Sequence, residues 1–151
     1  MTDEELVAGN VNPSHWDYKE EWHRLGAGFL VVVKRHQTES YRPANDGRQR
    51  WAVYAYIYPS HPIFSLFDGD GLFQMAANEL PLHCGASYLH WHCDTDGQRT
   101  SVQIGSDYDH LYDERFSHYR TKEEASEVFH DAKRLYEYLD AKEKEMKIDA
   151  D

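Results

Sequence analysis

The sequence is poor in cysteine and contains no long hydrophobic run. Its two cysteines, Cys84 and Cys93, do not have the Cys-x-x-Cys spacing of zinc ribbons or redox motifs, so free thiols in a reducing compartment are expected. No run approaches the roughly 18 apolar residues of a membrane-spanning helix. The stretch MTDEELVAGN lacks the apolar core of a signal peptide. We therefore expect a cytoplasmic protein that does not contact a membrane.

Positive charge is also scarce. Lysine and arginine together number 16 against 27 acidic residues, which gives a formal net charge of -11. Such a surface repels phosphates, so no nucleic-acid partner is expected. The sequence contains no Gly-x-Ser-x-Gly, no phosphate-binding glycine loop and no His-Glu-x-x-His, and the GDG at 69–71 is too short for an EF-hand loop. No cofactor is expected on these grounds.

What the sequence does contain predicts an α+β fold in a single domain, residues 1–151. Aromatic residues make up 14% of the chain, and disordered chains have few of them. Residues 26–36 and 51–59 have the patterns of strands. The Thr-x-x-Glu of Thr121 and Glu124 is a capping box, and an apolar stripe then predicts a helix over about 122–140, with 141–151 as a frayed helix end or tail. Residues 14–26 and 72–80 are interpreted as short helices.

The sequence of residues 87–106 predicts a β-hairpin at the centre of a mainly antiparallel sheet. The C-terminal helix should cover one face of this sheet. Asp96-Gly97 suits a two-residue type I′ turn. This turn places Trp91 opposite Val102 and His90 opposite Gln103, so apolar residues face apolar ones and polar residues face polar ones. On this register Trp91→Ala should lower the free energy of unfolding by about 3–5 kcal/mol, because Trp91 would occupy the core.

His90 and His92 share one face of the predicted strand and could in principle bind one metal ion. The neighbours on that face, Gln103 and Ser101, are poor metal ligands. Asp107 lies four residues beyond Gln103 on the same strand, which at about 3.4 Å per residue is about 13 Å, too far to share one metal site. We therefore predict that the two histidines belong to a polar sheet face and form no metal site as a pair.

Two other groups of residues are candidates for function. Residues 105–119 concentrate Asp107, His110 and further carboxylates just beyond a strand end, where a carboxylate that orients a histidine could provide a general base. Such residues are equally common in turns and caps. Tyr54, Tyr56 and Tyr58 alternate with the core residues of their strand and form either a second packed face or an interface.

Three short blocks resemble those of a group of small uncharacterised proteins from tailed bacteriophages and prophages. The first block matches at Pro59, His61 and Pro62. The second matches at His83, Gly85, Ser87 and Tyr88, with Cys84 in place of a glycine, and the third matches at Gly105, Asp107 and His110. The resemblance covers about residues 51–118 and implies a phage-type accessory protein in the cytoplasm of the host bacterium. It draws attention to His61, His83, Asp107 and His110 and carries no established activity.

Three functional hypotheses follow. The first is a binding or inhibitory module that occupies a host protein or assembles with itself, using Tyr54, Tyr56, Tyr58, His61 and Tyr88. The second is a hydrolase or nucleotide-processing enzyme in which His83, Asp107 and His110 meet at one end of the hairpin, with or without a divalent metal. The third is a protein that sequesters a nucleotide-like ligand.

Overall fold

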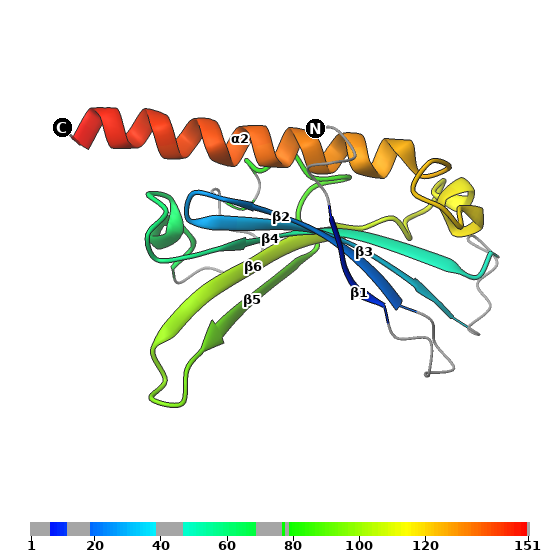
Figure 1. Ribbon diagram of the computed structural model, residues 1–151, viewed down its shortest axis with the longest axis horizontal. Coiled ribbons are helices and arrows are strands. Elements are labelled where there is room, and N and C mark those ends of the chain that lie inside the picture. Colours follow the sequence, from blue (N-terminus) through cyan, green and yellow to red (C-terminus); the bar gives the residue numbers. More distant parts are fainter. Residues whose placement is uncertain (1–6, 12–18, 39–46, 69–76, 78, 151) are drawn as a thin grey trace.

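The chain folds into one antiparallel sheet with a long helix on one face (Figure 1). This computed structural model describes residues 7–11, 19–38, 47–68, 77 and 79–150. The sheet has six strands in the order β1-β2-β3-β4-β6-β5. The strands are β1 (Val7–Val11), β2 (Lys19–Gly26), β3 (Phe29–Gln37), β4 (Gln49–Ile57), β5 (Tyr88–Cys93) and β6 (Arg99–Asp107). The expected α+β fold is confirmed.

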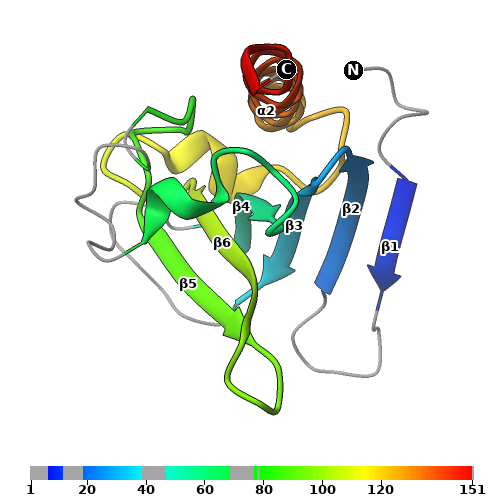
Figure 2. The same cartoon turned by 90° about the vertical axis from the view of Figure 1, so that its left-hand side faces the viewer.

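The core lies between the sheet and the helix α2 (Ser126–Ala150), which crosses above the middle strands (Figure 2). Strand β4 provides the sheet side of this core, because its residues alternate between the two faces of the sheet. Trp51, Val53, Ala55 and Ile57 are almost completely buried under the helix, whereas the tyrosines between them lie on the opposite face. Two 3-10 helices of the described residues, η2 (Phe64–Phe67) and η4 (Glu114–His118), each add a buried phenylalanine to the same core.

Helix α2 provides the other half of the core through the predicted stripe. Ala125, Val128, Ala132, Leu135 and Leu139 are buried, and Phe129 and Tyr136 pack beside them. The capping box is also present, because the Glu124 N–H donates to Thr121 Oγ1 at 3.1 Å. The helix begins at Ser126 after a turn and continues to Ala150, so residues expected to be a frayed end or tail are helical.

The N-terminal part of the chain differs from the prediction. Residues 19–26 form strand β2 and not the end of a helix, and β1, which the sequence pattern did not suggest, pairs with it. Trp22 is the only strongly apolar residue that β2 buries, and its ring stacks on Trp51 with a centroid distance of 5.8 Å. Pairing with the very apolar strand β3 along its whole length decides the conformation here.

The hairpin β5–β6 has the predicted register, but it forms one edge of the sheet and does not lie at its centre. Its turn also differs. Only Gly97 has a positive φ among the described turn residues, and the Gly97 N–H donates to the Asp94 carbonyl at 3.0 Å. This is a type I turn with a glycine bulge in place of a type I′ turn. The short helix expected over 72–80 falls largely outside the described residues.

Candidate functional site

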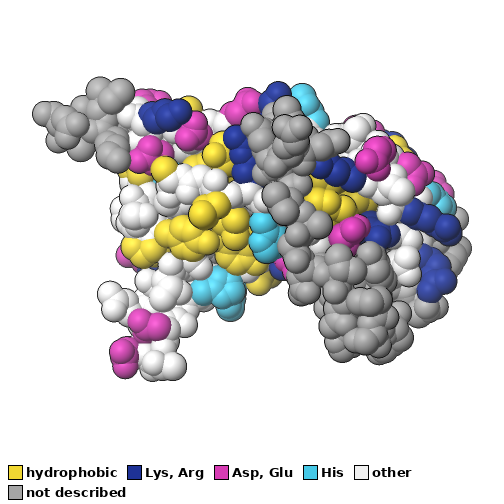
Figure 3. Space-filling view, viewed as in Figure 1, with side chains coloured by type: hydrophobic (Ala, Val, Ile, Leu, Met, Phe, Trp, Pro, Cys, Tyr) yellow, Lys and Arg dark blue, Asp and Glu magenta, His cyan; other side chains and the backbone are white. Residues whose placement is uncertain are grey.

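His90 and His92 point away from α2, because Leu89 and Trp91 on the same strand pack toward the core. The two imidazole rings lie 4.7 Å apart, edge to face. His92 Nε2 lies 2.8 Å from Oε1 of Gln103. The pair is part of a polar sheet face, as the predicted hairpin register implies. Figure 3 shows histidine side chains on this side of the molecule near the hairpin.

Trp91 lies on the predicted face, but the sequence overestimates its burial. The indole is half-buried, with Phe64 edge to face at 5.4 Å and the Arg99 guanidinium 4.0 Å above its ring. A side chain that is still partly in water loses less transfer free energy on truncation than a core residue does. The expected cost of Trp91→Ala is therefore below the 3–5 kcal/mol that applies to a buried ring.

The tyrosine face, defined here as Tyr54, Tyr56, Tyr58 and Tyr88, lies on the side of the sheet opposite α2. Tyr54 meets Tyr88 edge to face at 5.5 Å, and Tyr56 stacks on His92 at 5.7 Å. Burial raises the pKa of Tyr54, Tyr56 and Tyr58, so their hydroxyls stay protonated and can donate hydrogen bonds. The face therefore presents aromatic area together with polar tips.

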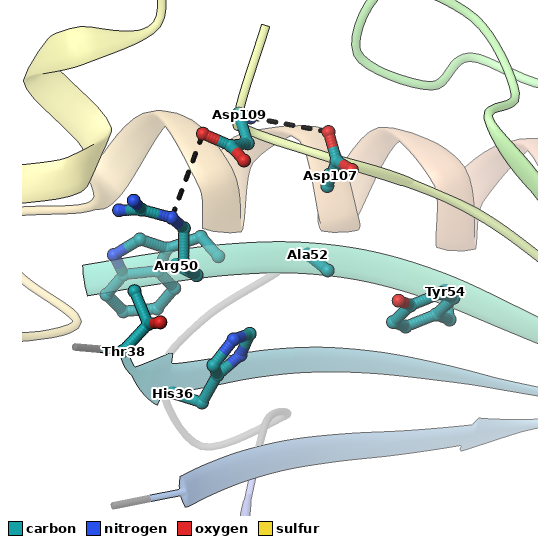
Figure 4. Close-up of a pocket in the computed structure, with 8 residues that line it drawn as sticks. His36, Thr38, Arg50, Ala52, Tyr54, Asp107 and Asp109 are labelled. Atoms are coloured by element: carbon teal, nitrogen blue, oxygen red, sulfur yellow. Dashed lines mark hydrogen bonds and ion pairs between the residues drawn. The ribbon is translucent and has the colours of Figure 1, made fainter. Parts of the chain in front are cut away.

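A pocket of about 260 Å³ lies at one end of this face (Figure 4). It is lined by His36, Thr38, Arg50, Trp51, Ala52, Tyr54, Asp107 and Asp109. The Asp109 N–H donates to Asp107 Oδ1 at 3.3 Å, and Asp109 Oδ1 lies 3.7 Å from the Arg50 Nε. Asp107 thus borders the pocket on one side and a group of histidines on the other.

This second group, the histidine cluster, consists of His83, Cys84, Asp107, His110 and Asp113. His83 precedes β5 and His110 follows β6, so the hairpin brings them to its open end with ring centroids 5.6 Å apart. Asp107 Oδ1 lies 3.6 Å from Nδ1 of His110. The structure therefore places His83, Asp107 and His110 together, as the hydrolase hypothesis requires.

Asp113, and not Asp107, is the carboxylate that fixes both imidazoles. Its oxygens lie 2.9 Å from Nε2 of His83, and Oδ2 lies 3.2 Å from Nδ1 of His110 and also accepts the His110 N–H at 3.0 Å. Burial disfavours the charged form of this 4%-exposed residue, but the backbone hydrogen bond from His110 and the bond to His83 outweigh it, so the pKa of Asp113 lies below its usual value. Asp113 is therefore an anion that both histidines can contact.

The aromatic residues around His83 hold the plane of its ring. Tyr108 stacks on His83 at 4.3 Å, and Phe116 approaches it edge to face at 5.6 Å. The Tyr108 hydroxyl donates to Asp131 Oδ2 on α2 at 2.5 Å, which connects the cluster to the helix. A cavity of about 580 Å³ begins at His83 and continues along the first turns of α2; its other lining residues are Arg115, Phe116, Ser126, Glu127, His130 and Asp131.

Cys84 occupies an unusual backbone conformation. Its φ is +58°, and Gly85 follows at +82°, in a turn closed by the hydrogen bond from the Gly85 N–H to the Leu82 carbonyl at 3.0 Å. The left-handed region costs a non-glycine residue about 1–2 kcal/mol. Partial burial, Asp113 and Asp107 raise the pKa of the Cys84 thiol.

His61 was a candidate binding residue on its sequence, but it joins neither the tyrosine face nor the histidine cluster. It is 2% exposed and lies under α2, where its Nε2–H donates to the Leu139 carbonyl at 3.0 Å. Its Nδ1 accepts the Ile63 N–H at 3.2 Å, and the ring meets Phe29 edge to face. Both contacts are satisfied only by the neutral ring, and burial lowers the pKa of His61.

This lowered pKa makes the stability of the fold depend on pH. The unfolded chain takes up a proton at His61 near pH 6.5, whereas the folded chain resists it to a lower pH, so stability falls as the pH drops from about 6.5 toward the folded pKa. We expect urea titrations to give a lower free energy of unfolding on the acid side of that window. His61→Gln should flatten this dependence and the exposed His90→Gln should not; equal slopes in the wild type and His61→Gln would contradict the assignment.

Asp113 is a residue of the site that the sequence alone does not single out. It was visible only as one more acid after His110, although the His110-x-x-Asp113 spacing places the two groups in one turn, where the Asp113 N–H donates to the His110 carbonyl at 3.0 Å. The position of Cys84 in the histidine cluster depends on its left-handed backbone φ, which no local sequence pattern specifies. Both residues become apparent only once the hairpin is closed.

Comparison of the chain with protein-family models, with curated proteins and with solved structures finds no match. Within the described part of the chain, no helix has the length and apolar character needed to cross a membrane.

Proposed function

We propose that the protein is a phage-type accessory protein that binds a host protein through the tyrosine face and inhibits it. The observation that carries this proposal is the asymmetry of the sheet. One face is packed under α2, η2 and η4, while the other presents half-buried and exposed tyrosines and histidines. Aromatic residues with polar tips are enriched in protein interfaces.

The tyrosine face is suited to this task because its rings are already arranged. Tyr54 and Tyr88 support each other, and Tyr56 is held against His92, so binding would immobilise few further side chains. The net charge of -11 favours a protein partner over a nucleic acid. A cytoplasmic host factor, such as a defence or regulatory protein, fits these features and the resemblance to phage proteins.

The proposal predicts that the tyrosine face determines partner capture. Tagged wild-type protein should retain a near-stoichiometric partner from host lysate, and the double substitution Tyr56→Ala and Tyr88→Ala should weaken binding at least tenfold, since truncating a central aromatic residue commonly costs about 2 kcal/mol or more. Affinity for the purified partner is then measured by calorimetry.

A matched control is Tyr112→Ala, because Tyr112 is 84% exposed and lies outside this face. Its affinity should equal that of the wild type. Circular dichroism of all variants shows whether they remain folded. A partner that binds the double variant as tightly as the wild type, or capture of nothing except further copies of this chain, would contradict the proposal.

A second candidate is a hydrolase or nucleotide-processing enzyme at the histidine cluster. It is favoured by the meeting of His83, Asp107 and His110 beside a 580 Å³ cavity. In that mechanism His110, oriented chiefly by Asp113, would act as general base. The same cavity could hold the nucleotide-like ligand of a sequestering protein. Nucleotide hydrolysis by the wild type that His110→Gln abolishes would favour the enzyme.

A further inference from the structure

We propose that His83, Cys84 and His110 bind one divalent transition-metal ion of the zinc type, with a fourth coordination position left open. Each of these residues offers one ligand atom, and the three atoms all lie within 4.8 Å of one another. Around a tetrahedral zinc ion with bonds of about 2.0–2.3 Å, ligand atoms are about 3.5 Å apart. Small side-chain adjustments therefore close the site.

The chemistry of the three ligands determines the class of ion. Two imidazole nitrogens and a thiolate sulfur suit zinc and similar borderline ions, whereas magnesium and calcium require oxygen ligands. The His90–His92 pair has only Gln103 and Ser101 opposite it on its face of the hairpin, and neither is a ligand of this kind. At the open end of the same hairpin, Cys84 adds a thiolate as the third ligand beside His83 and His110.

Asp113 provides the support that metal-binding histidines usually have. Metal-binding imidazoles commonly donate their other N–H to a carboxylate, which fixes the orientation of the ring. Asp113 contacts one nitrogen of His83 and one nitrogen of His110 at the same time. Its side chain is only 6% exposed, so both contacts are shielded from water. One buried carboxylate thus orients two of the three proposed ligands.

The backbone at Cys84 is a second and independent indication. A left-handed φ of +58° favours glycine, yet a cysteine stands there and directs its sulfur toward the two imidazoles. The neighbouring carboxylates of Asp107 and Asp113 create a negative field that would attract a cation. The cavity that begins at His83 offers a route by which water or a ligand could reach the open position. The inference does not depend on the function of the tyrosine face.

The test uses the full-length chain stripped of metal and titrated with Co²⁺ and Zn²⁺. Wild-type protein should bind one equivalent, and Co²⁺ should produce the thiolate-to-cobalt absorption band that reports a sulfur ligand. Cys84→Gly should abolish this band and weaken Zn²⁺ binding strongly, while the metal-free protein melts at or above the wild-type temperature, because glycine relieves the left-handed residue. This variant separates loss of metal binding from loss of folding.

Two further substitutions distinguish ligands from the positioning residue. His110→Gln should weaken Zn²⁺ binding more than Asp113→Asn does, and Asp113→Asn should weaken it by about 10–100-fold while the sulfur-to-cobalt band remains. The controls are Cys93→Ser and His90→Gln, which replace a cysteine and a histidine on β5, outside the proposed site. Both should leave the Zn²⁺ affinity and the Co²⁺ spectrum unchanged.

Binding of well under one equivalent by the wild type, or an unchanged cobalt spectrum in Cys84→Gly, would overturn the proposal. Equal losses in Cys93→Ser or His90→Gln would also overturn it, since they would place the metal elsewhere. None of these outcomes bears on partner capture by the tyrosine face, so the two proposals fail separately.

Discussion

Replacing Trp51 with alanine is expected to lower the free energy of unfolding by about 3–5 kcal/mol. The indole is 2% exposed, stacked on Trp22 at 5.8 Å and met edge to face by Phe129 of α2 at 5.9 Å. Its Nε1–H also donates to the Tyr119 carbonyl at 3.0 Å. Truncation would leave a cavity at the contact between sheet and helix and remove the hydrogen-bond donor from that carbonyl.

Urea denaturation followed by circular dichroism measures this loss, and Trp91→Ala is the matched control. Trp91 is half-buried at the edge of the sheet, so its truncation should cost clearly less. A larger loss for Trp91 than for Trp51 would mean that the core does not lie under α2.

Gly105→Ala is the second substitution with a large expected effect. A Cβ atom on Gly105 would lie 2.5 Å from the Val53 carbonyl oxygen and 2.3 Å from Cδ1 of Tyr54. The tyrosine ring can rotate, but the carbonyl belongs to the β4 backbone and can move only if β4 and β6 separate. Overpacking usually costs about 1–3 kcal/mol, and a clash with backbone places this substitution at the upper end, about 3 kcal/mol.

Gly97→Ala separates this steric cost from the loss of glycine's conformational freedom. Gly97 has a φ of +80°, and a Cβ there would meet no atom within 4 Å, so only the backbone strain of about 1–2 kcal/mol applies. Thermal and urea unfolding of both variants make the comparison. Equal losses at the two positions would contradict the close approach of Tyr54 and Val53 to Gly105.

The parts of the fold that the sequence predicts are those with a clear period. The alternation in β4 separates Trp51 and its partners from the tyrosines, and the stripe in α2 identifies the covering element. Strand β2 could not be predicted in the same way, because Trp22 stands among charged residues with no apolar alternation. Only pairing with β3 determines which of these residues lie on each face of the sheet. The hairpin register is correct although its turn type is not, since the bulge between His92 and Cys93 compensates for the longer turn.

The candidate site is predicted in outline for a related reason. His83 and His110 flank a hairpin, and strand pairing alone brings such flanking residues together. The contribution of Asp113 depends on the turn that follows β6, and that of Cys84 depends on a left-handed backbone angle. His61 shows the opposite case, because the local sequence around it does not tell whether the ring faces solvent or the core, and the structure buries it.

The open end of the hairpin has a consequence for how the histidine cluster could arise and vary. All five of its residues fall between positions 83 and 113, so a single contiguous segment of the chain encodes the cluster. Closing one local hairpin brings the ends of that segment together, and local contacts of this kind require little loop-closure entropy. The remainder of the chain holds the segment in place through Phe116, which packs on His83, and through Asp131, which accepts a hydrogen bond from Tyr108, but it supplies none of the cluster's side chains. Changes elsewhere in the sheet, including Tyr54, Tyr56 and Tyr58 of the tyrosine face, can therefore accumulate without altering the ligand set.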